Sequence, residues 1–286
     1  MNTKFLWSVR RELWEHRSIY VAPLFVAGLV LIGFLFKVGA LAAMMRTLSA
    51  LDPAKQRVAA VLPFTMPAAA ILFISFVVAL FYCLDALYGE RRDRSILFWK
   101  SMPVSDRTTV LSKAFVALAV IPFVSLLIAV TTQVLLLVLS SVVLLIGGVE
   151  ISTLWSNIPF VQMTLAMIYG LVVHALWYAP VYGWLLLVSS WAKKAPFLWA
   201  TAPVFAAFVF EKIALDSSYV FALVKYRAIG AMTEAFAPGA MRGPVTQLSQ
   251  LDPVRFLSSS GLWLGLAVAV AFLFAAIHMR RSREPI

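Results

Sequence analysis

One charged stretch, residues 87–113 with the sequence LYGERRDRSILFWKSMPVSDRTTVLSK, lies between long apolar runs of the chain. It holds six of the 24 basic residues. Over residues 90–100 charged side chains precede an apolar group in a helical pattern, and Pro103 ends the run because proline cannot continue a helix. Ser105 and Asp106 are good N-cap candidates for the helix that follows. The stretch therefore predicts a short amphipathic helix held between two membrane spans.

The charge of this segment has two interpretations. A solvated loop with positive charge can simply hold the topology of a membrane protein. Such a loop has no need of Phe98 and Trp99 beside its charge, whereas a helix that docks into the groove of a partner does. We therefore expect a partner-binding helix.

Residues 88–105, YGERRDRSILFWKSMPVS, resemble the cytoplasmic segment of ABC-2 type transporter permeases. In that family a cluster of acidic and basic residues leads to a step such as S-x-P-V-S and then to the third transmembrane helix. The match is specific over about 18 positions, and the number and spacing of apolar runs support it more loosely over the whole chain. The resemblance implies a cytoplasmic coupling helix between the second and third spans.

The resemblance also implies the partners. A separate ATP-binding cassette subunit, acting as a dimer, would bind ATP and Mg²⁺ and grip the coupling helix, and this chain would need no cofactor of its own. A second permease copy would complete a homodimer in the bacterial cytoplasmic (inner) membrane, and the expected activity is export. The residues that the resemblance assigns to the ATPase contact are Glu90, Arg91, Arg92, Asp93, Arg94, Phe98, Trp99 and Pro103.

The composition identifies an integral membrane protein. Of the 286 residues, 62% are hydrophobic and only 13% are charged. The net charge of +11 is spread over the ends of apolar runs, as binding to anionic lipid headgroups requires. Membrane lipid is therefore the expected partner of these basic residues, and nucleic acid is not.

Six apolar runs are long enough to cross about 30 Å of hydrocarbon, which takes roughly 20 helical residues. Residues 114–149 carry no charge over 36 positions, so this run is either one long tilted helix or two short spans. Two full spans would need about 40 residues and a turn, which favours one helix. The sequence thus predicts an all-α transmembrane domain over residues 18–286. Its spans are expected at about 18–41, 58–84, 114–146, 163–191, 195–214 and 258–279.

The distribution of basic residues predicts the orientation. With six spans both termini lie on one side, and 15 of the 24 basic residues fall on that side. By the positive-inside rule both termini are cytoplasmic.

Two further segments are expected to be helical outside the spans. Residues 1–17 carry Trp7 and Trp14 one heptad apart and Arg11 opposite an apolar face, which is typical of an amphipathic helix in the cytoplasmic membrane interface. Residues 215–257 are too apolar for a free linker and are punctuated by proline and glycine. They predict short outer helices before the sixth span, which either form an outer gate or merely pack as a lid.

The sequence contains no catalytic motif that we recognise. It has no G-x-x-x-x-G-K-[ST] phosphate loop, no H-E-x-x-H, no Cys/His cluster and no G-x-S-x-G elbow. We therefore expect neither ATPase activity nor a metal site in this chain. Among the ionisable residues, His174 lies well inside a span and is a weak candidate for the substrate path. A histidine in a helix rich in Tyr and Trp is more often an interhelical hydrogen-bonding group than a proton relay.

Two functions from different classes remain. One is the membrane subunit of an ATP-driven exporter, in which the segment 87–113 couples the spans to the ATPase. The other is a membrane scaffold or sensor that does not transport and recruits a soluble partner through the same helix. An intramembrane enzyme is disfavoured because the sequence lacks catalytic groups.

Overall fold

The computed structural model describes residues 3–48, 52–96, 104–148, 150–240 and 243–282, and this part of the chain is helical with no strand. The all-α class predicted from the sequence is therefore confirmed. Within the described ranges, Phe236 and Leu251 form an isolated antiparallel β-bridge. The α-helices are α1 (Thr3–Glu15), α2 (Ser18–Leu48), α3 (Pro53–Asp85), α4 (Tyr88–Arg92), α6 (Asp106–Phe115), α7 (Ile121–Ile146), α8 (Ile151–Asn157), α9 (Phe160–Trp191), α10 (Pro196–Leu215), α11 (Tyr219–Ala235), α12 (Pro253–Ser258) and α13 (Ser260–Ser282).

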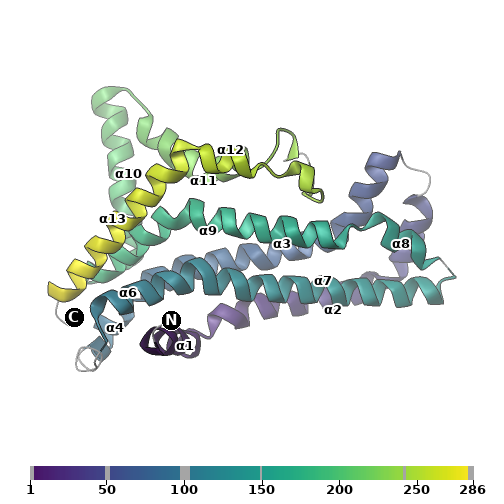
Figure 1. Ribbon diagram of the computed structural model, residues 1–286, viewed down its shortest axis with the longest axis horizontal. Helices are drawn as coiled ribbons and strands as arrows, with labels where there is room; N and C mark the ends of the chain where they lie inside the picture. Colours follow the sequence, from purple (N-terminus) through teal and green to yellow (C-terminus); the bar gives the residue numbers. More distant parts are fainter. Residues whose placement is uncertain (1–2, 49–51, 97–103, 149, 241–242, 283–286) are drawn as a thin grey trace.

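Six helical segments among the described residues are long and apolar enough to cross a membrane, which makes the chain a multi-pass membrane protein. They are built around α2, α3, α7, α9, α10 and α13. Four of them, α2, α3, α7 and α9, lie along the long axis, α13 runs obliquely and packs on α9, and α10 leans away from that bundle (Figure 1). Large apolar side chains such as Phe25 and Phe73 face outward, as a lipid environment requires.

Both ends of the described chain lie at the same end of the bundle, beside α4 (Figure 1). The ion pairs that Glu90 of α4 makes with Arg11 of α1 and Arg280 of α13 fix this arrangement. The short helix α8 lies at the opposite end (Figure 1). The bundle thus has one end that gathers α1, α4, the start of α6 and the last turn of α13.

The uncharged run that follows residue 113 is one continuous helix. It begins at Asp106, where the Ser105 hydroxyl accepts a hydrogen bond from the Thr108 amide as N-cap, and it continues through α7. Gln133 lies within α7, and its amide donates to the carbonyl of Phe64 in α3 at 3.2 Å. Residues 116–120 form a π-helical turn just before Pro122. This wider turn accommodates a residue that has no amide proton to donate.

The charged segment after α3 differs from the uninterrupted helix expected over residues 90–100. α4 ends at Arg92, and Arg94 has a φ of +58°, a left-handed conformation that an α-helix cannot include. The prediction of one continuous helix is therefore wrong at Asp93 and Arg94. The expected anchors Phe98, Trp99 and Pro103 lie outside the described residues.

The region before the last span contains α11, α12 and a short 3₁₀ turn at Leu248–Gln250. α11 packs against the middle of α9, where the Trp177 indole donates to the carbonyl of Arg227 at 2.9 Å. The guanidinium of Arg227 donates back to the carbonyl of Trp177 at 3.0 Å and lies over its ring. At the start of α11, Glu211 accepts hydrogen bonds from the amides of Tyr219 and Val220. These contacts fix α11 to α9 and to the end of α10.

Candidate functional site

A cluster of six ionisable side chains joins four helices at the end of the bundle that holds both termini. Three members are acidic and three are basic, so the cluster as a whole is neutral. Its members, called the charge cluster below, are Arg11 and Glu12 of α1, Glu90 of α4, Asp106 and Lys113 of α6, and Arg280 of α13.

Glu12 is the most deeply buried acid of the cluster, with no exposed surface. Its carboxylate accepts hydrogen bonds from Lys113 Nζ at 2.8 Å, from Arg11 Nη2 at 2.7 Å and from the hydroxyl of Tyr82 at 2.9 Å. A buried carboxylate is costly unless it is paired and its oxygens are bonded. The three donors meet that requirement and bind α1 to α6 and α3.

Glu90 connects the charged segment to the rest of the cluster. Its carboxylate lies 2.9 Å from Arg11, 3.1 Å from Lys113 and 2.5 Å from Arg280. Arg280 also bonds Asp106 at 3.0 Å, so the last turn of α13 is tied to α4 and to the first turn of α6. Because these contacts share acceptors and donors, the four helix ends are held as one unit.

The ionisation of the α1 members follows from this pairing. Burial raises the pKa of Glu12, but Lys113 and Arg11 outweigh it, so the pKa lies below its ordinary value. Burial lowers the pKa of Arg11, and the carboxylates of Glu12, Glu90 and Glu15 more than compensate. Both side chains are therefore charged at neutral pH, as their ion pair requires.

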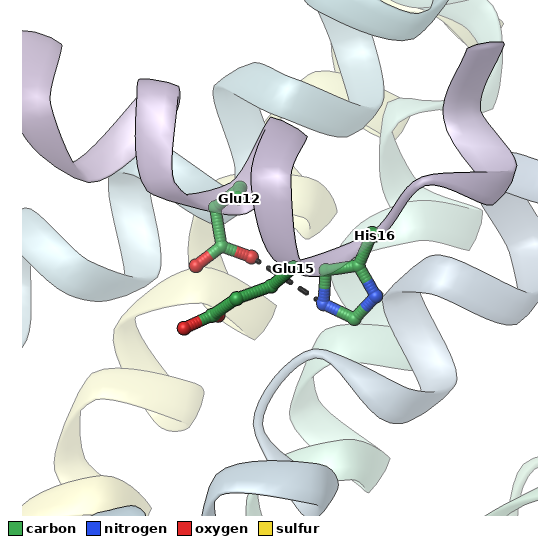
Figure 2. Close-up of side chains that lie close together, drawn as sticks. All are labelled: Glu12, Glu15 and His16. Atoms are coloured by element: carbon green, nitrogen blue, oxygen red, sulfur yellow. Dashed lines mark ion pairs between the residues drawn. The ribbon is translucent and has the colours of Figure 1, made fainter.

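Glu12, Glu15 and His16 bring their ligand atoms within 4.8 Å of one another, the spacing of a metal site (Figure 2). Glu12 already pairs with the ammonium group of Lys113 and the guanidinium of Arg11. His16 lies 3.7 Å from the Glu12 carboxylate, and burial holds its pKa below the ordinary value of 6.5. Cationic side chains thus take the place that a metal ion would have at Glu12.

Glu90 and Arg91 point into the chain rather than toward a partner. Arg91 is 3% exposed and donates to the carbonyls of Ser190 at 2.8 Å and Ala192 at 3.2 Å, at the end of α9. The hydroxyl of Ser189 accepts hydrogen bonds from the amides of Leu87 at 3.0 Å and Tyr88 at 2.9 Å. α4 is therefore anchored to α9 by hydrogen bonds between side chains and backbone groups, and to the charge cluster by Glu90.

Three other residues expected to bind the partner, Arg92, Asp93 and Arg94, are exposed. Arg92 bonds Asp93 at 2.9 Å and stacks on the ring of Tyr88. These three side chains form the outer face of the bend after α4, while Glu90 and Arg91 form its inner face. The expected partner-binding set is thus divided between a buried anchor and an exposed surface.

The helix at the N-terminus also has an inner and an outer face. Trp7 and Trp14 are exposed, and the guanidinium of Arg10 lies over both rings at 5.3 Å and 4.8 Å. Arg11, which the sequence pattern placed toward water, instead turns into the charge cluster. That expectation is wrong because the guanidinium of Arg11 pairs with the buried carboxylates of Glu12 and Glu90.

His174 lies in a different place, at mid-length of α9. Its Nε2 lies 2.8 Å from the hydroxyl of Tyr182, so its bonded partner belongs to the same helix and not to a neighbouring one. The ring also meets the edge of Phe76 of α3 and the ring of Tyr178. The residue borders a cavity of about 500 Å³ between helices.

The arrangement at the charge cluster suits the transmission of movement. It links the ends of α1, α6 and α13 to a charged segment whose outer face is exposed. Removing one member of such a buried network leaves an uncompensated charge, so the loss of one of these side chains would strongly destabilise the packing of these helices. Comparison of the chain with family models, with curated proteins and with solved structures finds no match.

Proposed function

We propose that this chain is the transmembrane permease subunit of an ABC-2 type ATP-driven exporter. It would form the translocation path as a homodimer and would be driven by a separate ATP-binding cassette subunit that engages residues 87–113. The single observation that carries the proposal is the connection of this segment, through Glu90, to the ends of α1, α6 and α13.

The division of the segment into an exposed face and a buried anchor explains how a partner would act on the spans. An ATPase subunit would contact the exposed Arg92, Asp93 and Arg94, with Phe98, Trp99 and Pro103 as further anchors in the same segment. Glu90 would pass the displacement to the charge cluster. Because the cluster holds four helix ends together, the ends of α1, α6 and α13 would move with α4.

The remaining parts of the proposal follow from the same arrangement. ATP and Mg²⁺ would be bound by the partner subunit, which acts as a dimer. The end of the bundle with both termini would face the cytoplasm of a bacterium, across the inner membrane. There α1 would lie in the membrane interface, with Trp7, Arg10 and Trp14 among the lipid headgroups. α11 and α12 would lie toward the outer side, as a gate or as a lid.

Site-directed photocrosslinking in cells of the native host tests the proposal. A benzoylphenylalanine that replaces Asp93 samples the exposed face of the bend, and one that replaces Ser152 of α8 is an exposed control at the opposite end of the bundle. We expect the first to form a crosslink to a protein with an ATP-binding cassette, identified by mass spectrometry, and the second to form none.

Crosslinks from position 93 to a soluble protein without an ATP-binding cassette would overturn the proposal. They would favour a membrane scaffold or sensor that recruits its partner through the same segment. Crosslinks from position 93 to lipid alone would remove both functions, because both require a soluble partner at this face.

A further inference from the structure

We infer that the cavity bounded by α3, α7, α9 and α11 binds a neutral, mainly apolar molecule that carries one hydroxyl group. The cavity has a volume of about 500 Å³, within the range of about 300 to 1,000 Å³ that is usual for small-molecule sites. It lies inside a single chain and away from residues 87–113. The inference therefore goes beyond the proposed coupling to an ATPase and does not depend on it.

The lining of the cavity sets the charge and polarity of its ligand. Among the described residues that line it there is no Asp, Glu, Lys or Arg, and the imidazole of His174 is the one ionisable nitrogen group. Most lining side chains are apolar, including Leu72, Phe76, Ile121 and Val173. An ionised group placed here would lose its hydration without finding a counter-charge, so a neutral ligand is selected.

Most of the polar lining groups already have hydrogen-bond partners. The hydroxyl of Ser75 donates to the carbonyl of Ile71 at 2.8 Å, and that of Ser125 donates to the carbonyl of Ile121 at 2.7 Å. The hydroxyl of Tyr178 donates to the carbonyl of Ala228 in α11 at 2.6 Å. Their protons are therefore committed to the protein, and a hydrogen bond donated to a ligand must come from another group.

His174 provides that group. Its Nε2 is paired with the hydroxyl of Tyr182 at 2.8 Å, while no hydrogen bond joins its Nδ1 to any residue that the structure describes. Nδ1 donates in one neutral tautomer and accepts in the other, and Tyr182 can match either. A hydroxyl group can also match either, because it both donates and accepts. An alcohol is thus the ligand class that suits both tautomers.

The rim of the cavity shows how such a molecule would enter. Phe73 of α3 and Met232 of α11 both line the cavity, yet they are 67% and 52% exposed. Their exposed surfaces belong to helices of the membrane domain, so the opening faces the surroundings of the bundle. An amphiphile dissolved in the bilayer would therefore reach His174 without crossing a charged surface.

A glycine in the cavity wall gives a clean way to fill the site. Gly170 lines the cavity, and a Cβ added there would meet no atom within 4 Å. The first side-chain carbon of Gly170→Leu therefore has room, and the variant replaces a poor helix former by a good one. Gly28→Leu in α2 is the matched control, because a Cβ at Gly28 also meets no atom within 4 Å and Gly28 does not line the cavity.

The test uses azi-octanol, an eight-carbon alcohol with a photoreactive diazirine, on the full chain in phosphatidylcholine nanodiscs. We expect saturable labelling of cavity residues in α3 and α9, located by peptide mass spectrometry. Gly170→Leu should lower this labelling about tenfold, and Gly28→Leu should leave it unchanged. His174→Phe should lower labelling by azi-octanol. It should not lower labelling by an octane that carries the diazirine but no hydroxyl group. Non-saturable labelling spread over outward-facing side chains, or labelling that Gly170→Leu does not reduce, would overturn the inference.

The source of the natural ligand is decided by a second readout. Mass spectrometry of molecules extracted from the purified wild-type chain, but not from Gly170→Leu, identifies a membrane lipid with a free hydroxyl. Saturable azi-octanol labelling without such an extracted molecule indicates a freely exchanging amphiphile. A failure of labelling leaves the crosslinking result at position 93 unaffected, so the two proposals fail separately.

Discussion

Lys113 is the most deeply buried of the three cations in the charge cluster. Its ammonium group lies 2.8 Å from Glu12 and 3.1 Å from Glu90, and its side chain is 1% exposed. It thus separates two buried carboxylates that would otherwise repel each other. A lysine at the boundary of a long apolar helix would be expected to reach toward water, yet here it turns inward because two acids converge on it.

The first prediction concerns this lysine. Lys113→Met keeps most of the side-chain volume but removes the charge, and it leaves Glu12 and Glu90 short of a cation. We expect a loss of about 3–5 kcal/mol of stability, the usual cost of breaking a buried ion pair from one side. Thermal unfolding of the purified chain in a mild detergent measures the change.

Lys194→Met is the matched control, because Lys194 is exposed in the turn between α9 and α10. It should unfold at the wild-type temperature. The double variant with Glu12→Gln and Lys113→Met should be more stable than Lys113→Met alone, since one of the two carboxylates that lost the ammonium group is then neutral. An unfolding temperature of Lys113→Met equal to that of the control would show that the cluster does not hold these helices together.

At the scale of elements, one hydroxyl group holds the turn that leads into α4. Ser189 of α9 accepts hydrogen bonds from two successive backbone amides, those of Leu87 and Tyr88, where α3 gives way to α4. Both amides would lack a partner without it, because they belong to the turn between two helices. This contact sets the position from which Glu90 enters the charge cluster.

The second prediction follows from this contact. Ser189→Ala leaves two amides unsatisfied and should cost about 1–3 kcal/mol. Hydrogen exchange of the peptide that contains Leu87 and Tyr88 should accelerate, and exchange in α2 should not. Ser190→Ala is the neighbouring control, because the hydroxyl of Ser190 bonds the carbonyl of Leu187 in its own helix and no other group among the described residues. Equal exchange in the two variants would contradict the assigned role of Ser189.

The elements themselves were largely predictable from the sequence. Apolar runs of sufficient length appear locally along the chain, and six of them correspond to helices able to cross a membrane. Boundaries were less predictable where charged residues enter a helix. α6 begins at Asp106 and contains Lys113, because the partners of these residues on other helices allow them to be buried.

The whole molecule is held at one end by contacts that no local pattern reveals. Glu90 is separated from Arg11 by 79 positions and from Arg280 by 190 positions, so each residue resembles an ordinary charge at the end of a span. In the sequence argument Arg11 belonged to the polar face of an interfacial helix, and Arg280 was one of the basic residues that set topology. Their role became visible once the fold placed them beside the same carboxylate.

The same limit applies to His174. Its place in an aromatic helix was evident from the sequence, but its bond to Tyr182 of the same helix and the cavity beside it depend on how α3, α7 and α11 pack around α9. That the charged segment binds a partner stays a prediction, and only the position of this segment between two spans could be predicted from the sequence. Its division into a buried and an exposed face could not.

The measurement that bears most directly on the proposed function is gentle purification of the tagged chain from its native host, with quantitative mass spectrometry of the bound proteins. We expect an ATP-binding cassette subunit in equal amount to this chain. It should be lost in Arg92→Glu and retained in Arg281→Glu, which reverses an exposed charge at the same end of the bundle but outside residues 87–113. Purification without such a subunit, or with equal retention in both variants, would contradict the proposal that this segment couples the membrane domain to an ATPase.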